Sequence, residues 1–278
     1  MDVFVMLALR PPVAPNPVLA ETFRILRRRG CNIDLGTGDE LLLQLDHLAV
    51  TYDLYILKSH AALWLSLAEI VHAHGGRLLN PLGGCVAVQN KIVAVQRMRD
   101  AGIPTPRSWV TSDPRLLRAM VEEHPVIMKP YNGGRGIGVR VVHDAHELAK
   151  TPRPTNPVVI QEYIRHGEEL KVYVIGEEVF GMRTRSWSRD GRRRPCAISR
   201  EVREIALRCG RVFDLGLYGL DVIDSVDGPL VIDLNYFPSY QGVPHAAGLI
   251  ADYIEDYALG RGSTRVRDVM GAIDGAVA

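Results

Sequence analysis

Two aspartates near the C-terminal end of the chain, Asp221 and Asp233, have the types and spacing of a cation site. They lie in a stretch, residues 217–235, in which two short apolar runs are separated by the turn signal Asp227-Gly228. A hairpin with a five-residue loop, 225–229, places the two aspartates directly opposite each other. Opposed side chains lie about 5 Å apart at Cβ, and like charges so placed destabilise a sheet, so the pair predicts a bound cation.

Asn235 extends this candidate site, because side chains alternate along a strand and Asn235 shares a face with Asp233. Three oxygen-bearing side chains then converge with no basic residue between them. Such a set suits a hard cation such as Mg²⁺, which keeps several waters and meets phosphate oxygens. The simpler alternative is a solvent-facing hairpin with scattered carboxylates. The candidate metal ligands are therefore Asp221, Asp233 and Asn235.

A glycine-rich stretch between two strand-like runs, VIMKP and VRVV, is a candidate phosphate-binding loop. Glycine tolerates positive φ and adds no bulk, so backbone N–H groups can close on phosphate oxygens. The stretch is neither a Walker loop nor a dinucleotide fingerprint, because no Gly-Lys-Ser/Thr follows and a strand rather than a helix comes next. A flexible hairpin turn is the alternative, and Lys129, three residues before the loop, favours the phosphate site. The candidate residues are Asn132, Gly133, Gly134, Gly136, Ile137 and Gly138.

Other polar residues carry possible binding roles, each with a simpler alternative. Lys91 follows the segment NPLGG and is otherwise a solvated helical lysine. The apolar strand VVIQEYI ends in Gln161, Glu162, Tyr163 and Ile164, which offer hydrogen bonds to an adenine edge or form an ordinary strand end. A dense group of arginines indicates an anion site, because guanidinium groups bind phosphate and carboxylate bidentately; a solvated basic loop is the alternative. Its six members are Arg183, Arg185, Arg189, Arg192, Arg193 and Arg194.

Composition describes an ordinary globular protein of 278 residues. Lysine and arginine total 33 against 32 acidic residues, so no global field indicates a nucleic-acid or membrane partner. The four cysteines lack C-x-x-C spacing, which suits a reducing, cytoplasmic location better than a disulfide frame or a zinc site. The apolar start is short and runs into Pro11-Pro12, so we expect a first strand rather than a signal peptide. The sequence contains no evident nucleophile elbow, so it gives no support to covalent catalysis by a side chain of the protein.

The elements that must position these residues follow from periodicity. The first 80 residues alternate strand-like runs (3–9, 41–50, 54–59) with helical ones (20–29, 63–74), which predicts a small parallel-sheet lobe. A helix is expected over 86–101, and a compact α+β unit over 109–164. After these we expect a hairpin turning at Gly176, a helix over 200–213, the aspartate hairpin, and a closing helix over 246–257.

Taken in order, these residues resemble the ATP-grasp superfamily over roughly residues 80–257, with the first 80 residues similar to its usual preceding lobe. The resemblance implies α/β and α+β architecture: a lobe over 1–82 and an ATP-grasp domain over 83–278, divided into a lid (about 107–164) and a catalytic part (about 165–278). Lys91 and Lys129 would then meet the phosphates, Gln161 to Ile164 the adenine, and Glu169 the ribose. One or two Mg²⁺, with Mn²⁺ as an alternative, would bind the aspartate hairpin. The implied catalytic cations are Lys171, Arg183, Arg193 and Arg194.

Two branches of that superfamily compete. The segment RLLNPLGGCVAVQNKIVAVQRMRDAGIPTP resembles the RimK-like carboxylate–amine ligases, although these usually carry Glu at the position of Asp233. The segments QEYIRHGEELKVYVIG and DLNYFPSYQGVP are similar to the inositol-trisphosphate kinases, including His166 and Lys171. Both begin with attack of an acceptor oxygen on the γ-phosphate of ATP.

We expect the ligase: an ADP-forming enzyme that makes an acylphosphate from a small acid and passes it to an amine. The first alternative is a kinase for an anionic polyol, and the second is an ATP-binding module without catalysis. The superfamily resemblance also allows a homo-oligomer, and we expect neither a nucleic-acid nor a membrane partner.

Overall fold

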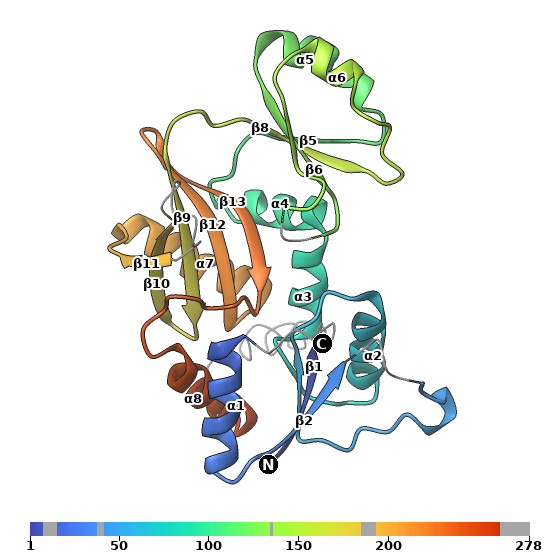
Figure 1. The fold of residues 1–278 in the computed structure, drawn as a ribbon, viewed down its shortest axis with the longest axis vertical. Helices are drawn as coiled ribbons and strands as arrows, with labels where there is room; N and C mark the ends of the chain where they lie inside the picture. Colours follow the sequence, from blue (N-terminus) through green and yellow to red (C-terminus); the bar gives the residue numbers. More distant parts are fainter. Residues whose placement is uncertain (8–15, 38–41, 134–135, 185–192, 262–278) are drawn as a thin grey trace, which may run out of the picture.

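The computed structural model describes residues 1–7, 16–37, 42–133, 136–184 and 193–261. Three sheets lie one above another: a four-stranded sheet in the N-terminal lobe, a five-stranded middle sheet, and a four-stranded sheet in the lid (Figure 1). No helix in the described ranges is long and apolar enough to cross a membrane.

The N-terminal lobe is the predicted parallel sheet, with strand order β2-β1-β3-β4. Its strands are β1 (Asp2–Leu7), β2 (Asn32–Thr37), β3 (Leu54–Leu57) and β4 (Leu78–Leu79), and its helices are α1 (Pro17–Arg28) and α2 (Ala62–Ala73). The strand expected over 41–50 is wrong: the described residues 42–50 contain a short 3-10 helix, η2 (Leu45–His47). Leu42 and Leu45 are exposed, and Val50 at the end of the segment is its one β-branched residue, so little favours strand pairing.

The helix predicted over 86–101 is two helices, α3 (Leu82–Gln89) and α4 (Lys91–Asp100). Asn90 separates them with extended backbone, φ −92° and ψ 101°, and its side-chain oxygen accepts hydrogen bonds from the N–H groups of Ile92 and Val93. An asparagine at this position satisfies the free donors of a helix start. The break makes Lys91 the first residue of α4.

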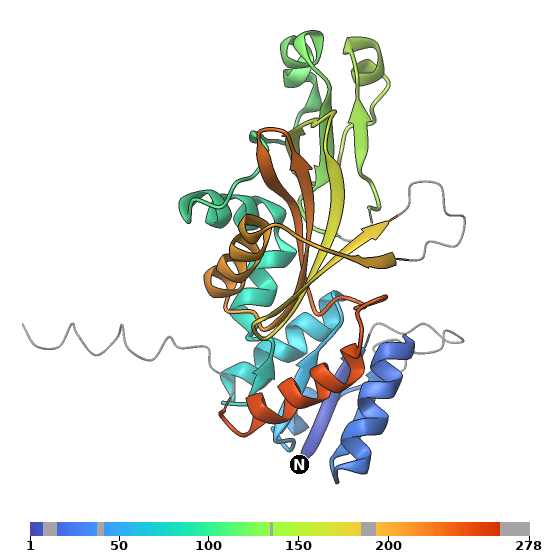
Figure 2. The same cartoon turned by 90° about the vertical axis from the view of Figure 1, so that its left-hand side faces the viewer.

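The middle sheet is antiparallel, with strand order β11-β10-β9-β12-β13. Its strands are β9 (Glu168–Ile175), β10 (Glu178–Thr184), β11 (Arg193–Cys196), β12 (Leu217–Ser225) and β13 (Gly228–Tyr236). The hairpin at Gly176 and the helix α7 (Arg200–Phe213) are confirmed. The closing helix α8 (Ala246–Ala258) returns to the N-terminal lobe and packs beside α1 (Figure 2).

The aspartate hairpin has the predicted pair but a different turn. Asp221 is opposite Asp233, as expected. The connection, however, is the two-residue turn Val226-Asp227, because Ser225 pairs with Gly228 rather than lying in a five-residue loop. A β-bulge at Ile232 restores the register, since Val222 pairs with Val231 while Asp221 pairs with Asp233. The shorter turn shifts the pairing by one residue from the predicted register, and the bulge shifts it back by one, so the predicted pairing of the two aspartates is kept.

The lid has the expected strand and helix order and its own sheet, β5-β8-β6-β7. It comprises β5 (Ser108–Thr111), η3 (Pro114–Leu117), α5 (Arg118–Glu123), β6 (Val126–Pro130), β7 (Arg140–Val142), α6 (Ala145–Ala149) and β8 (Val158–Glu162). Its small apolar core is separate from a larger one that runs continuously through the N-terminal lobe and the middle sheet. The chain boundaries predicted for the lobes stay a prediction.

Candidate active site

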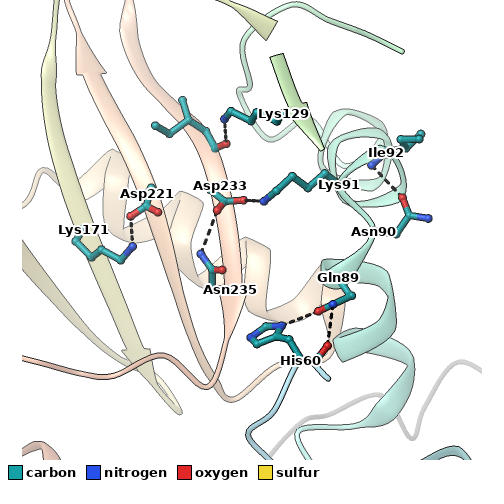
Figure 3. A network of polar contacts seen from close by, with 11 residues as sticks. His60, Gln89, Asn90, Lys91, Ile92, Lys129, Lys171, Asp221, Asp233 and Asn235 are labelled. Atoms are coloured by element: carbon teal, nitrogen blue, oxygen red, sulfur yellow. Dashed lines mark hydrogen bonds and ion pairs between the residues drawn. The ribbon is translucent and has the colours of Figure 1, made fainter. Parts of the chain in front are cut away.

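Asp221, Asp233 and Asn235 lie on one face of the β12–β13 hairpin, on the side toward α4 and the lid (Figure 3). The Asn235 amide donates a hydrogen bond to Asp233 Oδ2 at 3.3 Å. The two opposed carboxylates and the neighbouring amide oxygen form a donor set that fits a hard divalent cation.

Each carboxylate has a lysine partner, which corrects the expectation that no basic residue lies between them. Lys171 Nζ is 2.5 Å from Asp221 Oδ1, and Lys91 Nζ forms an ion pair with Asp233 Oδ1 (Figure 3). Lys171 reaches Asp221 because the two residues are register partners on β9 and β12, and Lys91 arrives from the start of α4. The hairpin alone could not reveal these partners.

Burial dominates the electrostatics of Asp221. It raises the pKa of this carboxyl, and the neighbouring Asp233 raises it further, whereas the ion pair with Lys171 acts in the opposite direction. A desolvated carboxylate beside a second one is stabilised by a nearby cation. The site therefore favours a metal ion in addition to the ammonium groups.

Lys129 joins the lid to this site. Its side chain is buried, with 7% exposed, and Nζ donates to the backbone oxygen of Ile232 at 2.8 Å. Ile232 is the residue that the bulge leaves without a register partner on β12. Burial lowers the pKa of Lys129, while the charge of Asp233 opposes that shift. The three ammonium groups of Lys91, Lys129 and Lys171 thus surround two carboxylates, which leaves a positive excess suited to a polyphosphate.

The glycine-rich loop begins beside the first turn of α4. Lys91 N–H donates to Tyr131 O at 2.7 Å, and Asn90 forms an isolated bridge with Asn132. Gly133, Gly136 and Gly138 have φ values of 131°, 70° and 77°, a region that favours glycine. Ile137 is 75% exposed, and Gly134 lies outside the described residues.

The lid sheet turns one face away from α5 and α6, and this face carries Lys129 together with Ile127 and Gln161. The Gln161 amide donates to Ser108 Oγ at 3.3 Å, but its Oε1 is buried without a hydrogen-bond partner. A buried unpaired acceptor costs about 1–3 kcal/mol, so it marks a place where a donor group is expected. An adenine amino group fits this need.

The rest of the predicted adenine strand end is already engaged. Arg107 binds the Glu162 carboxylate at 3.0 and 3.3 Å, and this hydrogen bond lowers the pKa of Glu162. The backbone N–H groups of Glu162 and Tyr163 donate to Arg107 O and Pro125 O. Ile164 is half-buried. Of the four predicted residues, Gln161 therefore has the clearest unused hydrogen-bonding capacity.

The predicted ribose and charge-stabilising residues divide between the two faces of the middle sheet. Glu169 is exposed and shares a face with Lys171. Arg193 shares it too, lies over the Tyr173 ring at 5.8 Å and donates to the Tyr173 hydroxyl. Arg183 and Arg194 oppose each other on the other face, where Arg183 binds Glu168 at 2.6 Å. The structure does not bring these two to the carboxylates.

Three of the six arginines, Arg185, Arg189 and Arg192, lie outside the described residues. A polar residue that sequence reasoning missed is Asn80, fully buried between the N-terminal lobe and the middle sheet. Its Oδ1 accepts from Gly216 N and Leu217 N at 3.0 and 2.9 Å, and its Nδ2 donates to Leu217 O at 2.8 Å. These bonds fix the start of β12, the strand that carries Asp221. The sequence holds no signal for this role, because its partners lie more than 130 residues away.

A second missed group is His60 with Gln89, which lies below Asn235 in Figure 3. His60 Nδ1 is 2.6 Å from Gln89 Oε1, and its ring stacks against Tyr236 with centroids 4.2 Å apart. The two residues are far apart in the chain, and neither lies in a recognisable motif.

The chain resembles known proteins in sequence and in fold. Residues 88–254 match the model of a RimK-like ATP-grasp domain. A probable alpha-L-glutamate ligase of Aeromonas salmonicida is 31% identical over 188 residues, which cover 57% of this chain and 63% of that relative's length, just under two thirds.

Solved structures show the same fold. The RimK domain ATP-grasp protein of Sphaerobacter thermophilus superposes with a TM-score of 0.73 at 18% identity, covering 91% of this chain and 99% of the other. The ATP-grasp ligase PsnB, complexed with a minimal precursor, Mg and ADP, gives 0.65 at 21% identity, with 91% and 97% covered. The predicted fold class and superfamily resemblance are thereby confirmed.

Proposed function

This chain belongs to the RimK-like ATP-grasp domain family, and we propose that it is an ADP-forming carboxylate–amine ligase that acts through an acylphosphate. Two proteins that it resembles are named as a probable glutamate ligase and an ATP-grasp ligase. The observation that carries the proposal is the convergence of Asp221 and Asp233 with Lys91, Lys129 and Lys171 beside the glycine-rich loop. This arrangement combines a metal-binding pair with a cationic surround for a triphosphate.

In this proposal Asp221, Asp233 and Asn235 would hold Mg²⁺, which would supply charge neutralisation for the triphosphate of ATP. Lys91 and Lys129 bind phosphate oxygens, and the glycines of the loop close over them. Lys91 and Lys171 lie against the carboxylates, so both ammonium groups are within the site and could bind phosphate oxygens. Gln161 accepts a hydrogen bond from the adenine amino group.

The chemistry then has two steps. A carboxylate oxygen of the acid attacks the γ-phosphorus, the bond from that phosphorus to the bridging oxygen breaks, and ADP leaves. The nitrogen of an amine next attacks the acyl carbon, the carbon–oxygen bond to phosphate breaks, and inorganic phosphate leaves. The site cations stabilise the charge that develops in the first step.

The kinase alternative rests on the similarity of two C-terminal segments to the inositol-trisphosphate kinases and on the group of six arginines. Of the three that the structure describes, Arg183 and Arg194 face away from the carboxylates, and Arg193 alone shares their face. A densely anionic polyol would need several guanidinium groups on one face, and two of the three described arginines do not contribute to it. The described arginines therefore add little to the kinase alternative.

The test incubates the protein with ATP, MgCl₂ and single acids, including L-glutamate, citrate and the other L-amino acids, with and without hydroxylamine. L-Glutamate comes first because the Aeromonas relative is named as a glutamate ligase. We expect ADP release together with a hydroxamate of one acid. A stable phosphorylated product without hydroxamate would instead establish a kinase, and ATP binding without turnover would establish a non-catalytic module.

A further inference from the structure

The N-terminal lobe contains a cavity of about 220 Å³, and none of the residues assigned to the candidate active site lines it. The cavity lies between the parallel sheet, helix α2 and the segment 43–52, which we call the roof segment. It is therefore enclosed by elements of the N-terminal lobe alone. Residues that line it include Phe4 and Met6 of β1, Tyr55 of β3, and Trp64 and Leu67 of α2.

Four aromatic rings of the lining contact one another. The centroid of the Phe4 ring lies 5.2 Å from that of Tyr52 and 6.1 Å from that of Tyr55. It also lies 5.9 Å from Trp64, and the two tyrosine rings are 5.5 Å apart. All four contacts are tilted or edge-on, the arrangements that aromatic pairs prefer. The cavity thus offers the same kind of contact to a further ring.

The polar atoms of these rings are bonded within the protein. Trp64 Nε1 donates to a backbone oxygen of β1 at 2.9 Å, and the Tyr52 hydroxyl donates to Asp34 Oδ2 at 2.9 Å. The Tyr55 hydroxyl accepts from two backbone N–H groups of the roof segment, at 3.0 and 3.4 Å. No Asp, Glu, Lys or Arg is among the described residues of the lining, and its imidazole, His74, is exposed. A charged ligand would lose its water there without gaining a charged partner, so the lining selects an uncharged one.

The roof segment is the part of the lining that we expect to move when a ligand enters. Leu43 is 39% exposed although it lines the cavity, and Leu48 is half-buried. The backbone hydrogen bonds around η2 are local, from His47 N to Gln44 O at 3.1 Å and from Leu48 N to Leu45 O at 3.3 Å. Segments with few buried apolar contacts and short-range bonds open at low free-energy cost.

We propose that this cavity is a binding site for an uncharged ring compound of the indole or alkylbenzene class. An apolar cavity of about 150 Å³ in another protein binds benzene. The present volume of about 220 Å³ therefore leaves room for a larger ring. Water gains little in such a lining, because a buried water needs several polar partners. The site belongs to the N-terminal lobe and does not depend on the proposed ligase function.

The experiment measures binding of indole to the full chain by calorimetry and by ligand-observed NMR, followed by competition. We expect saturable binding, and we expect toluene to displace the indole. Indole-3-carboxylate should need a concentration at least about 10-fold higher than toluene, because its charge finds no partner in the cavity. No saturable binding up to the solubility of indole, or equal competition by the carboxylate, would overturn the proposal. Displacement of indole by ATP with MgCl₂ would also overturn it, since the ring would then lie in the nucleotide site.

Variants that fill the cavity locate the bound ring. Leu48→Trp adds bulk from the roof segment and Leu67→Phe adds it from α2, and each should weaken indole binding about 10-fold or more. Leu63→Trp is the matched control, because Leu63 is 42% exposed on α2 and lies outside the lining, so binding should stay close to wild type. Circular dichroism verifies the fold of each variant.

Two further outcomes would contradict the assignment. Unchanged indole binding in the folded filling variants would place the ring elsewhere in the molecule. A dimer in light scattering that indole dissociates, and that Leu42→Ser abolishes, would assign the cavity to a second copy of the chain, because Leu42 is 99% exposed beside the roof segment.

Discussion

The lid and the middle sheet carry two halves of one site but are built differently. The middle sheet shares a continuous apolar core with the N-terminal lobe, including Leu220, Val172 and Phe213. The lid has its own small core, which includes Val126, Met128 and Ile160. A polar contact crosses between them, from Lys129 Nζ to Ile232 O, and Val231 N donates to Pro104 O at 2.9 Å in the segment that leads from α4 into the lid.

This difference in core size predicts that the middle sheet is the rigid half of the site and that the lid is the half that moves. The candidate metal ligands Asp221 and Asp233 lie on a sheet that belongs to the larger core, so their geometry is maintained by packing. Lys129 and the glycine-rich loop lie on an element with a core of its own, so we expect the lid to move as a unit with little exposure of the main core. Such a division suits a site that admits a nucleotide and then closes over it.

The largest effect is expected from the rigid half. Asp233→Ala and Asn235→Ala should each lower ADP release and hydroxamate formation about 10³-fold, because each removes an oxygen ligand that positions charge at the phosphates. Circular dichroism should show an intact fold. Asp227→Ala, at the exposed turn of the same hairpin, is the control. Unchanged turnover in both site variants would refute the metal assignment.

A smaller loss is expected from the lid half. Lys129→Met should lower kcat/KM for ATP about 10²-fold, because it removes one phosphate ligand but leaves the metal ligands in place. Steady-state kinetics with varied ATP measures this effect, with Lys150→Met on the outer side of the lid as the control. A change in the KM of the acid alone would place Lys129 on the acceptor side.

Two cavity variants test the separation of the cores. Leu220→Ala in the shared core and Ile160→Ala in the lid core should each cost about 2–5 kcal/mol. We expect Leu220→Ala to lower the main unfolding transition and Ile160→Ala to speed hydrogen exchange and proteolysis within the lid. Identical shifts of one cooperative transition would show that the lid does not open independently.

The smallest effect concerns pH. Burial lowers the pKa of Lys129 from its usual 10.5, so below that pH the unfolded state binds more protons than the folded state. Stability conferred by this residue should therefore rise as pH rises toward 10.5. Urea unfolding from pH 7.5 to 10 should show wild type gaining on Lys129→Met. A constant difference between the two would mean that Lys129 is solvated rather than buried.

The candidate site was partly predictable because some of its geometry is local. Alternation and a turn signal were enough to place Asp221 opposite Asp233, although the expected turn was too long and the bulge at Ile232 was not foreseen. A bulge leaves no periodic pattern in the sequence. The sequence therefore could not reveal that the turn is shorter than expected or that a bulge compensates for it. The helix over 200–213 was predictable for the same local reason: apolar spacing and the capping residue Ser199.

By itself the sequence determined which residue types were available and which strands and helices would carry them, since alternation, turns and caps act within a few residues. Tertiary structure decided which charges meet: Lys171 with Asp221, Lys91 with Asp233, and two arginines turned to the opposite face. It also brought His60 to Gln89 and Tyr236. Such pairs depend on strand order and lobe packing, because each partner gains its energy only after distant segments have come together.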